Sequence, residues 1–180
     1  MHGIIHTELQ RYVSSKVGAE AWAPLLADAG LPNKRYLMTE VYPDEEAGAL
    51  VGAAVRRTGL AAAVILEDLG AFLVPTLMKV YTPFVKPHWR TLDVIEHTEA
   101  TIHKAVRMRN PGARPAQLNT TRMSPTEVVL VYGSARRMCA VAHGIARGMA
   151  EHYSERIEIT ERAGMHRGAA ECTLSIKRVA

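Results

Sequence analysis

Tyr132-Gly133-Ser134-Ala135-Arg136 ends an apolar segment that is typical of a β-strand. Side chains at alternate positions of a strand share one face, so the Tyr, Ser and Arg of this stretch are expected to point the same way. One guanidinium and two hydroxyls on one face form a receptor for a carboxylate or a phosphate. An exposed strand end with a salt bridge is the alternative, so the rest of the chain has to be considered.

His103 stands upstream, on the inner edge of a helix predicted over residues 91–107. The apolar stripe of this helix comprises Leu92, Ile95, Ile102 and Val106. Glu99 interrupts the stripe, His103 borders it, and His97 falls on the polar face. An imidazole at the position of His103 can bind a metal. It can equally be a core histidine bonded to a backbone carbonyl or to Glu99 one turn earlier.

The histidine and the anion receptor together suit haem. The imidazole would bind the iron, and the receptor would bind the propionates. No second histidine in the sequence suits the opposite face of a haem. The iron would therefore keep an open coordination site, which a gas sensor needs.

The pattern of apolar residues predicts an α+β fold, with an N-terminal helical half followed by an antiparallel sheet with helices. Helices are expected over residues 3–17, 19–29, 62–80, 91–107 and 136–152 and from Asp44 to Gly59, and strands over 117–122, 127–132, 157–162 and 172–177. Pro75 should kink or break its long apolar helix. Gly144 and Gly148 lie one turn apart and would let another element approach closely.

Length and composition point to one ordinary globular domain. The chain has 180 residues, of which 48% are hydrophobic and 22% charged, and its net charge is +4. We expect a single domain over residues 1–180, with a helical part at about 1–110 and a sheet-containing part at about 111–180. The basic residues are scattered and no basic stripe carries interleaved aromatics, so no nucleic-acid partner is expected.

The apolar run of residues 61–66 is too short to span a membrane. The N-terminus is interrupted by His2 and His6, which does not suit a signal peptide. A cytoplasmic location is therefore expected.

In this order along the chain, these features resemble the haem nitric oxide/oxygen-binding (H-NOX) domain family. The resemblance extends over the whole chain. Met1–Ile5 is similar to the family's N-terminal helix, Tyr42–Glu45 to its Tyr-Pro-Asp segment, and Leu69–Phe72 to its distal helix, where Leu69 replaces a Phe. His103 falls where the family places its proximal haem ligand, and Pro115 resembles the proline that presses on the haem.

The most specific part of the resemblance is the propionate-binding signature, which Tyr132, Ser134 and Arg136 match. The resemblance implies that the protein binds haem b and senses a diatomic gas. It places Ile5, Leu9, Leu73 and Leu77 in the distal pocket. Family members that hold O2 carry a distal tyrosine, and Val141 stands at its place here. An apolar pocket offers no donor to bound O2, so the expected ligands are NO and CO, with poor O2 binding.

The resemblance also implies a movable bond. NO weakens the bond between iron and the trans ligand, and release of His103 would shift its helix while the haem relaxes against Pro115. Because the sequence contains no output module, we expect a separate partner, either a histidine kinase or a cyclic-di-GMP enzyme.

A second metal site is expected to be absent. Some relatives bind zinc through three Cys and one His, and Cys139 and Cys172 resemble two of those ligands. Glu161 and Gly164 stand at the other two places, so a closed zinc shell is not evident, even with His166 nearby. Two buried or pairable thiols are the favoured interpretation, and a reversible disulfide is the lesser alternative.

Three other interpretations compete with a gas sensor. The first is a haem-free relative that uses the cavity for another small molecule or for protein contact. The second is an enzyme, against which stands the absence of a catalytic triad, a phosphate-binding Gly loop or paired carboxylates. The third is a haem or NO carrier without signalling output. We rank the haem-free relative second and do not expect an enzyme.

Overall fold

The computed structural model describes residues 1–179. The first half is helical. Its helices are α1 (Gly3–Val17), α2 (Trp22–Asp28), α3 (Asp44–Thr58) and α4 (Ala62–Tyr81), with a short 3-10 turn at Ala19–Ala21 before α2. Helix α3 has three acidic residues in its first turn and two arginines in its last, which complements the helix dipole. Its end is set by Gly59, whose φ of 71° lies in the left-handed region that favours glycine.

The second half combines three further helical segments with a sheet. A 3-10 turn at Thr82–Phe84 leads to α5 (Thr91–His97), a π-turn at Glu99–His103 and α6 (Lys104–Arg109), and α7 (Cys139–His152) comes later. The strands are β1 (Gln117–Ser124), β2 (Glu127–Gly133), β3 (Arg156–Ala163) and β4 (Cys172–Val179). They form one antiparallel sheet in the order β1-β2-β4-β3.

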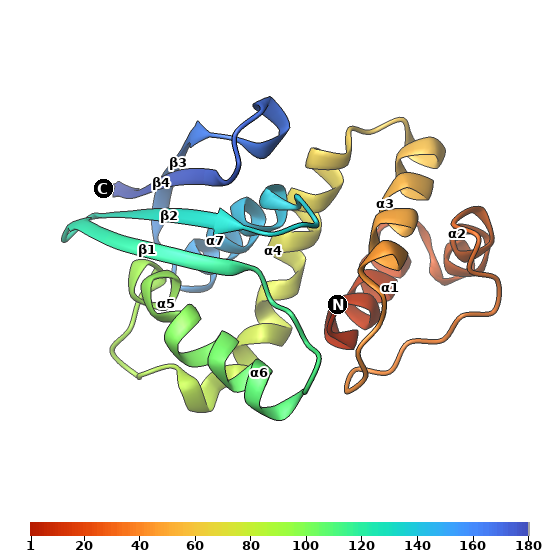
Figure 1. Ribbon diagram of the computed structural model, residues 1–180, viewed down its shortest axis with the longest axis horizontal. Helices are drawn as coiled ribbons and strands as arrows, with labels where there is room; N and C mark the ends of the chain where they lie inside the picture. Colours follow the sequence, from red (N-terminus) through yellow and green to blue (C-terminus); the bar gives the residue numbers. More distant parts are fainter. Residues whose placement is uncertain (180) are drawn as a thin grey trace.

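The sheet buries one face against helices. Alternate residues of β2 and β4, such as Val128, Leu174 and Ile176, are completely buried and pack against Leu92 of α5 and Ala146 of α7. Figure 1 shows the sheet on the left with α7 behind it and α5 below it, and α1, α2 and α3 grouped on the right. Helix α4 runs between these two parts, so residues from both can line a common space.

Helices α4 and α7 cross at very short range, as expected from the glycine spacing. A Cβ on Gly144 would lie 1.8 Å from the carbonyl oxygen of Glu67, and one on Gly148 would lie 2.8 Å from that of Ala71. On α4, a Cβ on Gly70 would lie 2.4 Å from the carbonyl oxygen of Val141. Only glycine allows the two backbones to approach this closely.

The predicted α+β class and the helix-then-sheet order are confirmed. Three details differ. Helix α4 continues through Pro75 instead of breaking, the helix predicted from residue 136 begins at Cys139, and the helix predicted over 91–107 contains a π-turn. Among residues 1–179, no single helix is long and apolar enough to cross a membrane, although α3 and α4 with its following turn meet that test as a pair bent by 114°.

Candidate functional site

A cavity of about 250 Å³ lies between the N-terminal helices and the half that contains the sheet. Apolar side chains of α1, α4, α5 and α7 form most of its wall. The apolar wall includes Ile5, Leu9, Leu77, Ile102, Pro115 and Val141. The polar side chains that reach it include His103 on one side and Tyr132 and Arg136 near the sheet end. The space therefore suits a flat apolar molecule with an acidic edge.

His103 reaches this cavity from the π-turn. Its backbone N–H donates to the carbonyl oxygen of Thr98 at 2.9 Å, five residues earlier, where an α-helix would use the residue four earlier. π-turns inside helices are frequent at functional sites. The His103 side chain is 18% exposed, and Ile102 beside it also lines the cavity. The sequence predicted the inward edge of the helix but not the π-turn.

Glu99 holds the His103 ring. Its Oε2 lies 2.8 Å from Nδ1 of His103, and its Oε1 accepts from Arg107 at 2.7 Å. Burial alone would raise the pKa of Glu99, but the hydrogen bonds from His103 and Arg107 outweigh it and lower the pKa. For His103 burial is the largest influence and lowers the pKa, against the raising effects of Glu99 and the Ala116 carbonyl. A neutral imidazole is the form that can bind a metal.

The sequence Tyr132–Arg136 forms a turn at the end of β2, since the strand ends at Gly133. The prediction that Tyr132, Ser134 and Arg136 share one strand face is therefore wrong in its geometry. Ser134 Oγ accepts from the backbone N–H of Arg136 at 3.3 Å, and Ser134 is not in the cavity wall. The turn nevertheless keeps Tyr132, Ser134 and Arg136 close together. Burial raises the pKa of Tyr132, and the nearby Ser134 hydroxyl and Arg136 guanidinium partly offset this rise.

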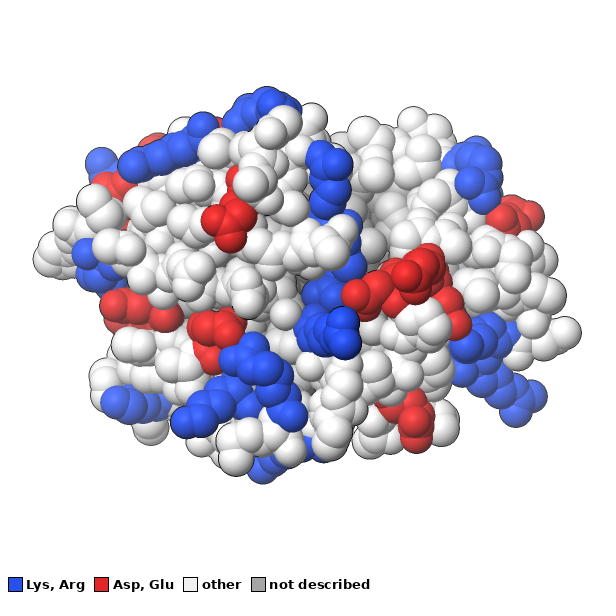
Figure 2. Space-filling view, viewed as in Figure 1, with Lys and Arg blue, Asp and Glu red and all other residues white. Residues whose placement is uncertain are grey.

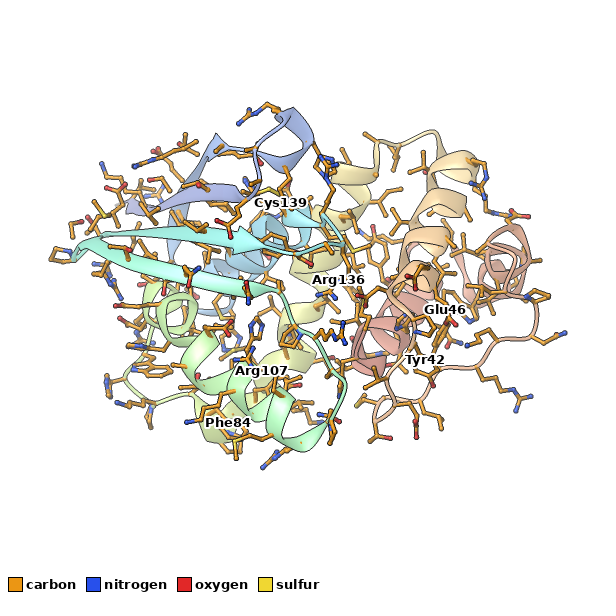
Figure 3. All side chains as sticks on the ribbon, in the orientation of Figure 1. Tyr42, Glu46, Phe84, Arg107, Arg136 and Cys139 are labelled. Atoms are coloured by element: carbon orange, nitrogen blue, oxygen red, sulfur yellow. A yellow bond between two sulfur atoms is a disulfide. The ribbon has the colours of Figure 1, made fainter. Side chains whose placement is uncertain are left out.

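Arg136 is fixed from two sides. Its Nη1 donates to Asp44 Oδ2 at 2.9 Å, and its Nη2 donates to the carbonyl oxygen of Arg114 at 2.9 Å. Asp44 also pairs with the N-terminal ammonium of Met1 at 2.7 Å. Figure 3 shows Arg136 at the centre of the molecule, between the end of β2 and the N-terminal helices, and Figure 2 shows a column of Lys and Arg side chains across the same region.

The cavity brings together most of the predicted site residues. His103, Pro115, Tyr132, Arg136, Ile5, Leu9, Leu77 and Val141 all line it. Leu73 is not among the residues of the cavity wall, so its place in the distal pocket stays a prediction. Leu73 lies on α4 and is completely buried in a core cluster, in which it packs with Leu9, Leu50 and Leu69.

Two histidines of α1 also reach the cavity, and the sequence analysis did not assign them there. His2 caps α1 by accepting from the backbone N–H of Ile4 at 3.3 Å. His6 is fully buried and stacks on Tyr36 with ring centroids 4.3 Å apart. The spacing of His6 with Leu9 is that of one helix face and could have indicated its burial. His2 and His6 therefore join His103 in the cavity wall.

His6 should make the protein sensitive to mild acid. Burial and then the N-terminal ammonium lower the pKa of His6 from 6.5 to about 4. Between these values the unfolded chain binds a proton that the native protein does not. We expect the free energy of unfolding to fall as the pH drops from 6.5 towards 4, by up to about 3 kcal/mol. Urea titrations at stepwise pH would measure this.

His6→Phe keeps the stacked ring and should reduce the slope of stability against pH above pH 5. The pKa of His103 is also lowered in the folded protein, so His103 likewise makes the free energy of unfolding fall in acid. A smaller slope of stability against pH should therefore remain in His6→Phe. His88→Gln removes an exposed histidine and is the control. An unchanged slope in His6→Phe would contradict the prediction.

Cys139 and Cys172 form a disulfide that joins the start of α7 to the start of β4. The two cysteines are buried and paired, which agrees with the favoured interpretation of buried or pairable thiols, and the reversibility of the disulfide stays a prediction. Close by, His166 Nε2 lies 2.8 Å from the carbonyl oxygen of Arg137. Among residues 1–179, no group of three or more His, Cys, Asp or Glu side chains is arranged to hold a metal ion.

An α+β fold that encloses an apolar cavity, with a histidine in its wall and a fixed arginine at one end, is an arrangement that suits haem. The sequence matches the Haem-NO-binding (HNOB) family over residues 2–161, so the chain belongs to this family of haem-based gas sensors.

Solved structures of H-NOX proteins resemble the chain over its full length. The H-NOX protein from S. oneidensis in the Fe(II)NO ligation state is 25% identical, with a TM-score of 0.93 and 100% of both chains covered. The Shewanella oneidensis H-NOX domain in the Fe(II)CO state is 26% identical, with a TM-score of 0.87 and 99% of both chains covered. An unliganded Fe(II) H-NOX protein from K. algicida, 19% identical, shares the fold, with a TM-score of 0.88 over 100% of this chain and 97% of its own. No curated protein matches the chain.

The residues present fit a haem. His103 is aligned through Nδ1 by Glu99, which leaves Nε2 for an iron. Arg136 carries a charge that suits a propionate, and the walls between them are apolar.

Proposed function

We propose that this chain is a haem b-based sensor of nitric oxide, with CO as a second ligand, and that it acts on a separate signalling protein instead of catalysing a reaction itself. A cytoplasmic location and action of residues 1–180 as one sensing domain belong to the same proposal. The observation that carries it is the position of His103 and Arg136 in the wall of one apolar cavity.

Each residue has a role in this proposal. Ferrous haem, when bound, would supply an iron that can take a diatomic gas. His103 would bind the iron through Nε2, while Tyr132, Ser134 and Arg136 would bind the propionates. Pro115 would press against one haem face. The distal residues Ile5, Leu9, Leu77 and Val141 would exclude water from the gas.

The output would begin at His103. His103 would hold the iron from the π-turn Glu99–His103, and a shift of this turn would carry the signal. Glu99 also accepts from the backbone N–H of Leu118 at 3.2 Å, so a shift of the turn would reach β1. A two-state change of this kind could alter the surface that a histidine kinase or a cyclic-di-GMP enzyme recognises.

The test is to load the reduced protein with haem and to record its visible spectrum before and after NO. A five-coordinate ferrous spectrum that changes with NO supports the proposal. Capture of a kinase or cyclic-di-GMP enzyme from a native extract that depends on NO would support the output. If the chain refuses haem, the haem-free interpretation replaces the proposal.

Val141 should limit O2 binding, because its side chain has no hydrogen-bond donor. We expect the ferrous protein in air to form no stable O2 complex. Val141→Tyr should bind O2 about tenfold more tightly or better, as a hydrogen bond of about 1.5 kcal/mol would allow. Val141→Phe, which has the same ring without the hydroxyl, is the matched control. A stable O2 complex in the unmodified protein would contradict the prediction and direct attention to His6.

A further inference from the structure

Glu99 occupies a position that an apolar residue would be expected to fill. It interrupts the apolar stripe of its helix, and its side chain is 30% exposed. Removing a carboxylate from water is unfavourable unless hydrogen bonds replace the water. Glu99 has three such bonds, which come from His103, Arg107 and the backbone of Leu118. Its place in the helix is therefore explained by these contacts.

The three contacts come from different parts of the fold. Arg107 belongs to α6 and binds Oε1 at 2.7 Å, on the exposed side. The N–H of Leu118 belongs to β1 and binds Oε2 at 3.2 Å. The same Oε2 lies 2.8 Å from Nδ1 of His103. The carboxylate is thus anchored independently of the histidine, and it can orient the ring instead of following it.

A carboxylate on Nδ1 determines the proton distribution of the ring. A neutral imidazole has one N–H, and an acceptor at Nδ1 favours the proton there. The lone pair is then on Nε2, which is the atom available to a metal. A carboxylate acceptor also increases the electron donation of the imidazole, and loss of such partners commonly weakens metal affinity 10- to 100-fold.

We propose that Glu99 is the positioning residue of His103, and that its charge strengthens the bond from His103 to iron and so sets how readily the protein releases His103 when NO binds. This inference rests on the proposed role of His103 as the haem ligand. The His103 ring has a second acceptor nearby, the backbone carbonyl of Ala116. This carbonyl is neutral, whereas the Glu99 carboxylate carries a charge.

The experiment compares Glu99→Gln with Glu96→Gln. The glutamine at 99 keeps an oxygen for the Leu118 N–H and removes the charge, so the fold should be retained. Glu96 is a matched control, because it is a carboxylate of α5 that binds Arg122 at 2.7 Å and does not contact His103. Glu99→Leu is a second, more severe variant, and circular dichroism would verify folding of all three.

Three measurements report on the proposal. In the haem-free protein, nitrogen NMR of His103 should find the proton on Nδ1, and Glu99→Gln should shift it towards a mixture. In the ferrous haem-loaded protein, the iron–histidine stretching band in the resonance Raman spectrum should move to lower frequency in Glu99→Gln. Haem transfer to an excess of apomyoglobin should indicate an affinity about 10-fold weaker.

The outcomes separate this inference from the proposed function. If Glu99→Gln matches Glu96→Gln in all three measurements, the inference is overturned, and the Ala116 carbonyl or packing alone orients the ring. If the ferrous protein shows no iron–histidine band at all, the proposed function fails first, and the NMR result on the haem-free protein still decides whether Glu99 positions His103. A lower band frequency with a larger five-coordinate fraction after NO supports both.

Discussion

Replacing His103 by Gly is expected to abolish stable haem retention. The His103 side chain borders the apolar cavity and is aligned by a carboxylate, so its loss would remove the proposed iron ligand and leave only apolar contacts and the proposed propionate contacts. Loss of a residue that only supports a metal ligand commonly weakens metal affinity about 10- to 100-fold. Because His103 would be the ligand itself, we expect haem affinity to fall about 100-fold or more. Absorption spectra after gel filtration of the haem-loaded variant would measure retention.

Added imidazole should restore a five-coordinate ferrous spectrum in His103→Gly, because the truncated side chain leaves room for the free base. His97→Ala is the matched control. His97 lies on the same helical segment but stacks on Trp89, with ring centroids 4.6 Å apart, and does not line the cavity. Retention of haem by His103→Gly without imidazole, with the spectrum of the unmodified protein, would show that another residue is the ligand.

The second large effect is expected at the crossing of α4 and α7. In Gly144→Val even the first carbon of the new side chain would lie 1.8 Å from the carbonyl oxygen of Glu67 and 2.9 Å from the backbone nitrogen of Ala71. Both are backbone atoms of a helix, so no side chain can rotate away, and the helices must separate. We expect a loss of about 4 kcal/mol or more in the free energy of unfolding. Urea denaturation followed by circular dichroism would measure it.

Gly48→Ala is the control for a glycine-to-larger change in a helix. Gly48 lies on the exposed side of α3, and a Cβ there would meet nothing within 4 Å. Alanine favours the helix by up to about 1 kcal/mol over glycine, so this variant should be as stable as the parent or slightly more stable. If Gly144→Val loses less than about 1 kcal/mol, the close approach of α4 and α7 is not what the structure indicates.

Helix α4 also forms part of the cavity wall, so the crossing has a second consequence. Gly70 on α4 packs against the carbonyl oxygen of Val141 on α7, and Val141 lines the cavity. Separation of the helices would move Val141 and Leu77 away from their positions. A milder variant, Gly148→Ala, whose Cβ would lie 2.8 Å from the Ala71 oxygen, should therefore weaken haem retention before it unfolds the protein.

The order and approximate ranges of the helices and strands could be predicted from the sequence because they depend on local spacing. In α7 the apolar period of 3.6 reflects which side chains the helix turns inward, whereas residues 128–132 of β2 are a continuous apolar run whose burial alternates in the folded sheet. The crossing of α4 and α7 could also be anticipated, because glycines at Gly144 and Gly148 fall on one helix face. Pro75 does not break α4, which is continuous over Ala62–Tyr81, and a kink at the proline stays a prediction.

Glu99 illustrates what local spacing misses. On a helical projection it is an interruption of an apolar stripe. In the folded chain its partners are Arg107 and the Leu118 N–H as well as His103, and Leu118 lies on a strand that the projection of one helix does not include. A charge can therefore be favourable at an apolar position when another element supplies donors.

By itself the sequence determined the family, the order of helices and strands, and the histidine and arginine that the site needs, because these depend on residue type and local spacing. Tertiary structure decided which residues meet. It placed Arg136 on Asp44, buried Leu73 in a core cluster, brought His6 to the cavity wall and joined Cys139 to Cys172. These contacts link residues far apart in the chain, and the packing of whole elements, which no local pattern encodes, fixes their distances.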